Sequence, residues 1–80
     1  MRVRAEFTSE PFDMAQPPEH VRAALRALEE SGLRHEFGPF GTSVWGDTTE
    51  IIPVVAAVLE TVFAHEGIRV TLQVERDGQP

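Results

Sequence analysis

The chain has 80 residues, enough for one small domain with a modest core, and its 41% apolar and 25% charged residues are typical of a globular protein. Thirteen acidic residues outnumber seven basic ones, all arginine, and the resulting net charge of −6 argues against nucleic acid, which binds clustered Lys and Arg. No apolar run approaches the roughly 20 residues that span a bilayer, and without cysteine there is neither a disulfide framework nor a thiolate site. The charged, alternating N-terminus does not resemble a signal peptide, so we expect a cytoplasmic protein without a membrane partner.

The first third of the chain predicts a strand, a loop and a helix. Residues 2–9 alternate between apolar and polar side chains, which is the pattern of a half-buried strand. Breakers at both ends of residues 10–17 predict a loop. A helix is expected from Pro18 to Ser31, because apolar residues recur there at helical spacing, namely Val21, Ala24, Leu25 and Leu28.

The middle of the chain predicts a hairpin. Residues 33–37 alternate and form the second expected strand. The sequence Gly-Pro-Phe-Gly over residues 38–41 suits a turn with proline at its second position. Residues 42–46 return as the third strand.

The last third predicts a second helix and a fourth strand. Asp47 begins a cluster of helix-capping side chains, but a proline late in the first turn would remove a needed donor, so we expect a loose opening and a regular helix from Pro53 to His65. Its expected buried stripe is Val55, Val58, Leu59, Val62 and Phe63. Residues 68–76 alternate, with four side chains expected to face inward: Ile68, Val70, Leu72 and Val74.

The two halves of the chain repeat one unit. Each half has a strand, a helix that begins near proline and ends at Gly32 or Gly67, and a second strand. The order β-α-β-β-α-β predicts an α+β ferredoxin-like sandwich, with a four-stranded antiparallel sheet and two helices on one face. Residues 1–76 are expected to form the domain, and residues 77–80 a tail.

The sheet face without helices is expected to be polar apart from one large aromatic side chain. That side chain is Trp45, which would stand among arginines, glutamates and hydroxyls. Because an exposed tryptophan usually finds a partner, we predict self-association through this face as a homodimer or a dimer of dimers.

The residues offer no support for catalysis or metal binding. His20, His35 and His65 lie on different elements and are expected to be surface or partly packed residues. No nucleophile stands in a strained elbow, and the loop after the first strand, Glu10 to Asp13, would repel the phosphate that an acylphosphatase binds there. A binding module is the remaining class. Candidate residues gather at one end of the sheet, where hydroxyls, bare backbone and an aromatic ring suit a planar heteroaromatic ligand: Thr8, Ser9, Phe40, Gly41, Thr42 and Ser43.

The chain also resembles a known family over nearly its whole length. The resemblance lies in residues 5–12 (AEFTSEPF), 29–33 (EESGL), 38–42 (GPFGT), Gly46 before the long helix, and the ending 74–77. These segments, in this order and spacing, resemble the thiamine-binding domains formerly called a domain of unknown function. Two positions depart from the family pattern, since Trp45 stands where the family usually has glutamate and no glycine occurs near residues 12–13.

The resemblance implies a ferredoxin-like fold, assembly through the sheets as dimers or tetramers, and no catalysis. It also implies binding of thiamine or its hydroxymethylpyrimidine part, as a sensor or carrier with no cofactor. Under this reading the pyrimidine stacks on Phe40 or Trp45, the hydroxyls named above bond to it, and Glu6 or Asp47 lies near the thiazolium cation. The alternative is a structural or regulatory oligomerisation module without a small ligand.

Overall fold

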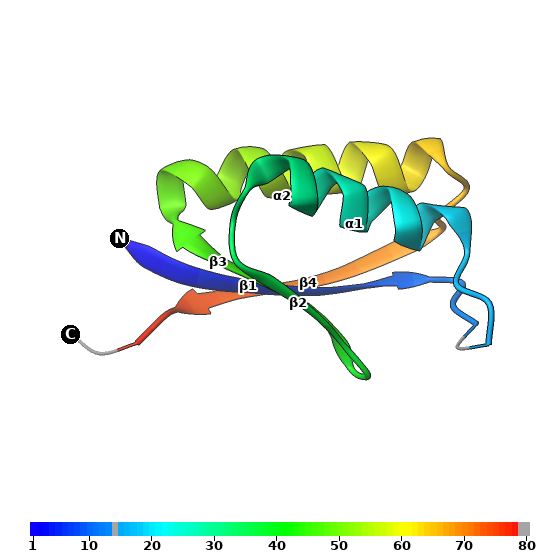
Figure 1. The fold of residues 1–80 in the computed structure, drawn as a ribbon, viewed down its shortest axis with the longest axis horizontal. Helices are drawn as coiled ribbons and strands as arrows, with labels where there is room; N and C mark the ends of the chain where they lie inside the picture. The colour runs from blue at the N-terminus through cyan, green and yellow to red at the C-terminus, as the bar shows by residue number, and fades with distance from the viewer. Residues whose placement is uncertain (14, 79–80) are drawn as a thin grey trace.

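The computed structural model describes residues 1–13 and 15–78 of the chain (Figure 1). Residue 14 of the expected loop and residues 79–80 of the expected tail lie outside this range. The elements follow the predicted order: β1 (Arg2–Glu10), α1 (Glu19–Ser31), β2 (His35–Gly38), β3 (Gly41–Asp47), α2 (Thr48–Ala64) and β4 (Arg69–Arg76). The strands form one antiparallel sheet in the order β2-β3-β1-β4, and both helices lie on the same side of it. The predicted ferredoxin-like sandwich is therefore confirmed.

The core lies between the helices and the sheet. Alternation along β1 buries Val3, Ala5 and Phe7 toward the helices, as the sequence pattern predicts. The core is completed by side chains from both helices and from β3: Ala24, Leu28, Val44, Ile51, Val58 and Val62. Within the two described ranges, neither helix is long and apolar enough to cross a membrane.

The ends of α1 agree with the predicted capping residues, except that the helix begins one residue later than expected. Pro18 is the N-cap residue rather than the first helical residue, and the carbonyl of Pro18 accepts from the amide of Val21. Gly32 ends the helix at φ +74°, a conformation that a residue with a Cβ rarely adopts.

The start of α2 differs from the sequence-based expectation. The helix begins at Thr48, five residues before Pro53, because Asp47 forms a complete capping box with Glu50. The Asp47 carboxylate accepts from the amide of Thr49, and the Glu50 carboxylate accepts from the amide of Asp47. Pro53 is exposed, so the carbonyl left without its amide partner one turn earlier can bind water. The expected loose opening is therefore wrong.

In the second half of the chain, several side chains that were expected to be buried are exposed. Phe63 is 53% exposed, and on β4 Ile68 and Val74 are 77% and 51% exposed. The alternation along β4 is correct, since Val74 and Leu72 pair with the buried Ala5 and Phe7 of β1. The cover is incomplete: α2 packs mainly over β1 and β3, and most of β4, at the sheet edge, stays exposed, although Val70 still packs against the core.

Candidate functional site

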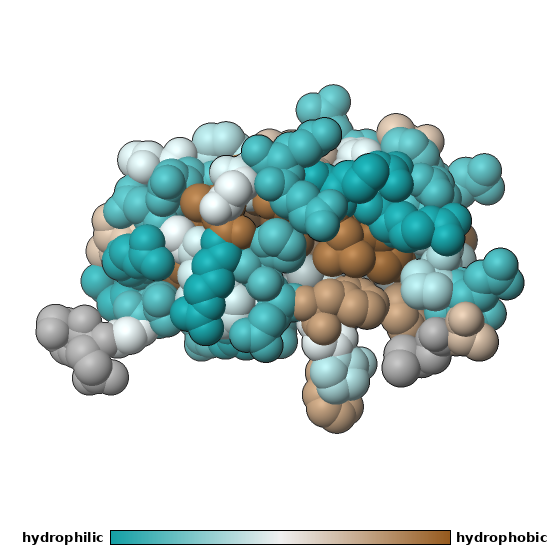
Figure 2. All heavy atoms as spheres, viewed as in Figure 1, coloured by the Kyte–Doolittle hydropathy of each residue, from teal (hydrophilic) through white to brown (hydrophobic). Residues whose placement is uncertain are grey.

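A cavity of about 270 Å³ lies at one end of the sandwich. It is bounded by the C-terminal end of β1 and the loop after it, by the β2–β3 hairpin, and by the first turns of α1. Figure 2 shows apolar surface gathered on this face between the helix layer and the hairpin. The lining residues are Phe7, Thr8, Ser9, Glu10, Phe12, Val21, Ala24, Phe37, Gly38, Pro39, Phe40, Gly41 and Thr42.

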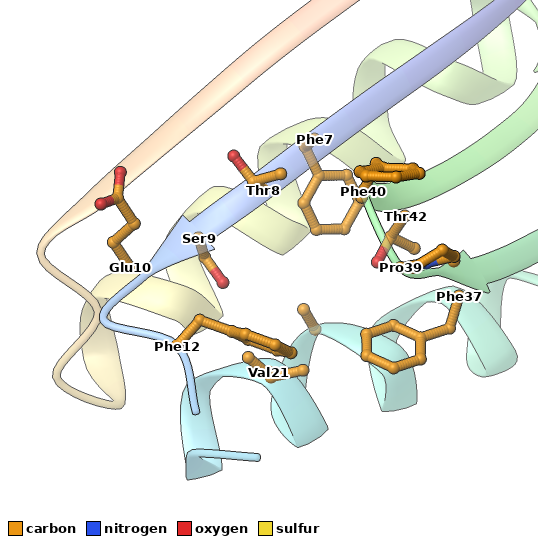
Figure 3. A pocket seen from close by; sticks show the side chains of 13 residues that line it. Phe7, Thr8, Ser9, Glu10, Phe12, Val21, Phe37, Pro39, Phe40 and Thr42 are labelled. Carbon is orange, nitrogen blue, oxygen red and sulfur yellow. The ribbon is translucent and has the colours of Figure 1, made fainter. Parts of the chain in front are cut away.

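Aromatic rings form two walls of the cavity. Figure 3 shows Phe12 and Phe37 approaching from opposite sides, with Val21 of α1 between them. The centroids of the two rings are 6.4 Å apart and the ring planes are tilted by 49°. Both rings are about half exposed, and the buried Phe7 adds a third apolar surface from β1. Such walls favour a flat, apolar-faced ligand.

A buried histidine fixes the polarity of one cavity hydroxyl. The His20 ring is 2% exposed, and its Nε2 lies 2.7 Å from the carbonyl oxygen of Pro11. Because a carbonyl can only accept, Nε2–H donates to it, and in the tautomer with its proton on Nε2 the Nδ1 atom accepts from the Ser9 hydroxyl at 3.0 Å. The Ser9 oxygen therefore faces the cavity as an acceptor. The expectation that His20 is a surface or partly packed residue is wrong.

Thr42 supplies the second hydroxyl. Its side chain is 5% exposed, and Figure 3 shows its oxygen turned toward the space between β1 and α1. Among the described residues no side-chain hydrogen bond engages this oxygen, so it can both donate to and accept from a ligand. The neighbouring Gly41 has φ +154°, and a Cβ there would lie 3.2 Å from the carbonyl oxygen of Phe7. Glycine is favoured at this position, because a side chain would crowd the β1 backbone and the φ angle is one that other residues rarely adopt.

Glu10 is the carboxylate among the lining residues, and it is already paired. Nε of Arg69 donates to the Glu10 carboxylate at 2.8 Å. This hydrogen bond, together with the charge of Arg69, holds the pKa of the Glu10 carboxyl below its usual value. Figure 3 shows the Glu10 side chain turned away from the cavity interior. The ligand-facing interior is therefore uncharged.

The structure brings together five of the nine residues singled out in the sequence. Ser9 and Thr42 point into the cavity, Gly41 supplies bare backbone, and Phe40, 88% exposed, stands at the hairpin tip. Thr8 lies at the rim, where its side chain follows the opposite face of β1 from Ser9.

The other four residues lie outside the cavity. Glu6 and Ser43 are paired across β1 and β3 on the outer face, and Trp45 is two residues farther along that face. The guanidinium of Arg34 lies 4.2 Å from the Trp45 ring centroid and covers one face of the indole. Asp47 lies at the far end of β3, where its carboxylate binds the N-terminal ammonium at 2.6 Å and has a lowered pKa for that reason.

Sequence reasoning missed the cavity residues that come from α1, from the loop before α1 and from β2. Val21 and Ala24 lie on adjacent turns of α1, His20 supports the lining residue Ser9 from the first turn, and in the sequence these positions carried only a packing signal. Phe12 and Phe37 are separated by a helix in the sequence, so only the tertiary structure shows that their rings meet. The one usable signal was the presence of a phenylalanine in the sequence on either side of α1.

The chain is similar to several known proteins. A UPF0045 protein of Synechocystis is 36% identical over 53 residues, which cover 66% of this chain and 44% of that protein, so the match spans less than half the length of this curated relative. A solved hypothetical protein of Methanocaldococcus jannaschii is 25% identical with a TM-score of 0.72, covering 99% of this chain and 81% of the other. A Thermotoga maritima structure, provisionally described as a thiamine biosynthesis/salvage protein, shares the fold at 22% identity and a TM-score of 0.72, covering 99% and 85%.

The family comparison covers almost the entire chain. The model of the family described as thiamine-binding protein matches residues 5–80, a range that contains every residue of the cavity lining. The chain belongs to the thiamine-binding protein family.

Proposed function

We propose that this chain is a cytoplasmic, non-catalytic protein that binds thiamine or its hydroxymethylpyrimidine precursor and acts as a sensor or carrier. Family membership supports the thiamine chemistry. The observation that carries the proposal is the pair of hydroxyls, Ser9 and Thr42, set in a cavity with phenylalanine walls. An aminopyrimidine presents matching groups: two π faces for the rings, an amine that donates and a ring nitrogen that accepts.

The polarity of the two hydroxyls orients the ligand. The Ser9 hydroxyl donates its hydrogen bond to Nδ1 of His20 in the tautomer protonated on Nε2, so the ligand atom facing the Ser9 oxygen has to be a donor, which the exocyclic amine supplies. Among the described residues the Thr42 hydroxyl has no hydrogen-bond acceptor, so it can donate to a ring nitrogen of the ligand. A volume of about 270 Å³ is just below the usual range for ligand pockets, which favours enclosure of the pyrimidine ring with the remainder of thiamine outside.

The test is isothermal titration with thiamine, its phosphates and hydroxymethylpyrimidine. In Thr42→Val the shape of the side chain is kept and the hydroxyl is lost, so affinity should fall by about tenfold, the effect of one hydrogen bond of about 1.4 kcal/mol. Ser43→Ala is the matched control, because Ser43 is the next residue on β3 and faces the other side of the sheet. Absence of binding heat with every one of these compounds would contradict the proposal.

Self-association through the outer sheet face belongs to the same proposal. Trp45 is partly exposed there in spite of the Arg34 cover, and a second subunit on this face would bury the rest of the indole. Trp45→Ala should then shift the protein toward monomer in sedimentation equilibrium. If native mass spectrometry of fresh protein finds no small molecule and titration finds none, an oligomerisation module becomes the better description.

A further inference from the structure

His20 is the one buried titratable side chain among the described residues. Its ring is not part of the cavity lining but lies behind it, bonded to the lining residue Ser9 on one side and to the carbonyl of Pro11 on the other. A side chain that is buried, ionisable and bonded to a binding residue can control how that residue meets a ligand.

The His20 ring can accept a proton without losing a hydrogen bond. In the neutral ring, Nε2–H donates to the Pro11 carbonyl and Nδ1 accepts from the Ser9 hydroxyl at 3.0 Å. When Nδ1 takes a proton from solvent, the bond of Nε2 is unchanged, and Nδ1–H donates to the Ser9 oxygen instead. The hydroxyl hydrogen of Ser9 then turns away from the ring, toward the cavity. Protonation of His20 therefore converts Ser9 from an acceptor into a donor on the ligand side.

We propose that His20 is a positioning residue whose charge selects the ligand. With the neutral ring the cavity takes a pyrimidine that carries an exocyclic amine, and with the protonated ring it takes the corresponding oxo-pyrimidine. The amine donates and so matches the Ser9 oxygen, whereas the carbonyl oxygen of the oxo ring accepts and so matches the Ser9 O–H. This selection rests on the proposed function, because it requires a pyrimidine ring in the cavity.

Thr42 does not make this choice, because its hydroxyl can donate or accept. Among the described residues no side chain bonds to it, so it can turn to suit either ring. The ring nitrogen beside an amine accepts, and the one beside a carbonyl carries hydrogen and donates. Thr42 pairs with Phe7 across β3 and β1, and Ser9 is two residues farther along the same face of β1, so the two hydroxyls are diagonal neighbours that can contact one ring. Ser9, held by His20, is the hydroxyl that discriminates.

The other charged groups around His20 lie at the surface. Carboxylates and guanidinium groups keep their charge between about pH 5.5 and pH 8, where imidazole changes its own. The hairpin over residues 37–42 contributes no charge, and the charged groups of the other surrounding elements are all exposed: Glu10 of β1, Asp13 of the loop, Glu19, Arg22 and Arg26 of α1, Glu66 after α2, and Arg69 of β4. The histidines His35 and His65 bond backbone carbonyls of their own segments and do not line the cavity. The charge change that reaches Ser9 in this range is therefore that of His20.

The first experiment observes the His20 ring without ligand. Nitrogen-15 NMR of the imidazole groups distinguishes protonated from unprotonated ring nitrogens, and His35→Gln and His65→Gln assign the three histidines. At pH 8 the His20 ring should be neutral with its proton on Nε2, and at pH 5.5 both nitrogens should carry protons while circular dichroism shows the fold retained. A neutral ring protonated on Nδ1, or a ring that stays neutral at pH 5.5, would overturn the proposal.

The second experiment compares two ligands by calorimetry at pH 8 and pH 5.5. They are hydroxymethylpyrimidine and its analogue with a carbonyl oxygen in place of the amine. Wild type should prefer the amino ligand about tenfold at pH 8, the effect of one hydrogen bond, and the ratio of the two affinities should fall at least about tenfold at pH 5.5. Affinity for the oxo analogue should itself rise on acidification, a readout that needs no variant.

Ser9→Ala is the matched variant, because it removes the hydroxyl that responds and leaves the ligands' own protonation in place. Its ratio of affinities should change with pH much less than that of wild type, whereas His35→Gln and His65→Gln should respond as wild type does. If hydroxymethylpyrimidine binds but the wild-type ratio follows that of Ser9→Ala, selection by His20 is overturned and the proposed function stands. Loss of the response in His35→Gln or His65→Gln overturns it equally. Absence of heat with every thiamine-related compound contradicts the proposed function itself, and the selection with it.

Discussion

The two β-α-β halves of the molecule bury their apolar side chains in different ways. At the β2–β3 end, α1 and the hairpin surround a polar centre of His20, Ser9 and Thr42 and leave a cavity that is open to solvent on one side. Over β1 and β3, α2 has a purely apolar face and leaves β4 and its own outer flank uncovered. The first region has its polar groups placed for a small ligand, whereas the second has unpaired backbone and apolar side chains suited to a protein surface.

The largest effect that distinguishes these regions is expected from His20→Ala. Removing the ring leaves the Pro11 carbonyl without its donor and the Ser9 hydroxyl without its acceptor, and opens a cavity beside them. The free energy of unfolding in urea should fall by about 2–4 kcal/mol. His65→Ala is the comparison, because that ring bonds only within the last turn of α2 and is partly exposed, and its loss should cost less than about 1 kcal/mol. Equal losses would show that the buried polar centre does not hold the cavity end together.

An intermediate effect is expected from neighbouring residues on α2. Val62 is fully buried, so Val62→Ala should cost about 1–3 kcal/mol of unfolding free energy. Phe63 is a larger side chain but faces the open flank, so Phe63→Ala should cost at most about 0.5 kcal/mol when urea unfolding is measured on dilute, monomeric protein. If Phe63→Ala costs as much as Val62→Ala under those conditions, the flank of α2 is covered within the single chain and the contrast between the two regions fails.

The smallest effect concerns the Glu10–Arg69 pair, which links the cavity rim to β4. Because the folded pKa of Glu10 is lowered from 4.5, the pair stabilises the folded state above pH 4.5, and this contribution disappears as the pH falls through the folded pKa. Thermal melts of wild type and Glu10→Gln should therefore differ slightly at neutral pH, with wild type more stable, and converge on acidification below pH 4.5. A difference that stays constant over this range would mean that the pair makes no contribution through ionisation.

The parts of the fold that depend on short-range patterns were predicted from the sequence. The alternation of β1, the left-handed end of α1 at Gly32 and the hairpin with Gly41 each follow from a preference expressed within a few residues. The start of α2 was misplaced because proline was given more weight than the Asp47 capping box. Both signals were in the sequence, but only the structure shows that an exposed Pro53 lets the cap prevail.

The candidate site was predicted in part for the same reason. Ser9, Gly41 and Thr42 lie near strand ends that the topology brings to one end of the sheet. The predicted order of the strands was therefore enough to identify them. Phe12 and Phe37 meet only after α1 folds onto the sheet, and the role of His20 depends on a carbonyl from the loop and a hydroxyl from β1. No spacing in the sequence encodes those contacts.

The sequence by itself determined the order of the elements, the α+β class and which face of each strand is apolar, because backbone preferences and side-chain periodicity act locally. The tertiary structure decided how far each apolar face is covered. Val62 and Phe63 are adjacent apolar residues, yet one is buried and the other is half exposed, since the crossover places α2 above β1 and β3 and short of β4. Burial depends on where a neighbouring element ends, and that is a property of the assembled layers rather than of any segment of the chain.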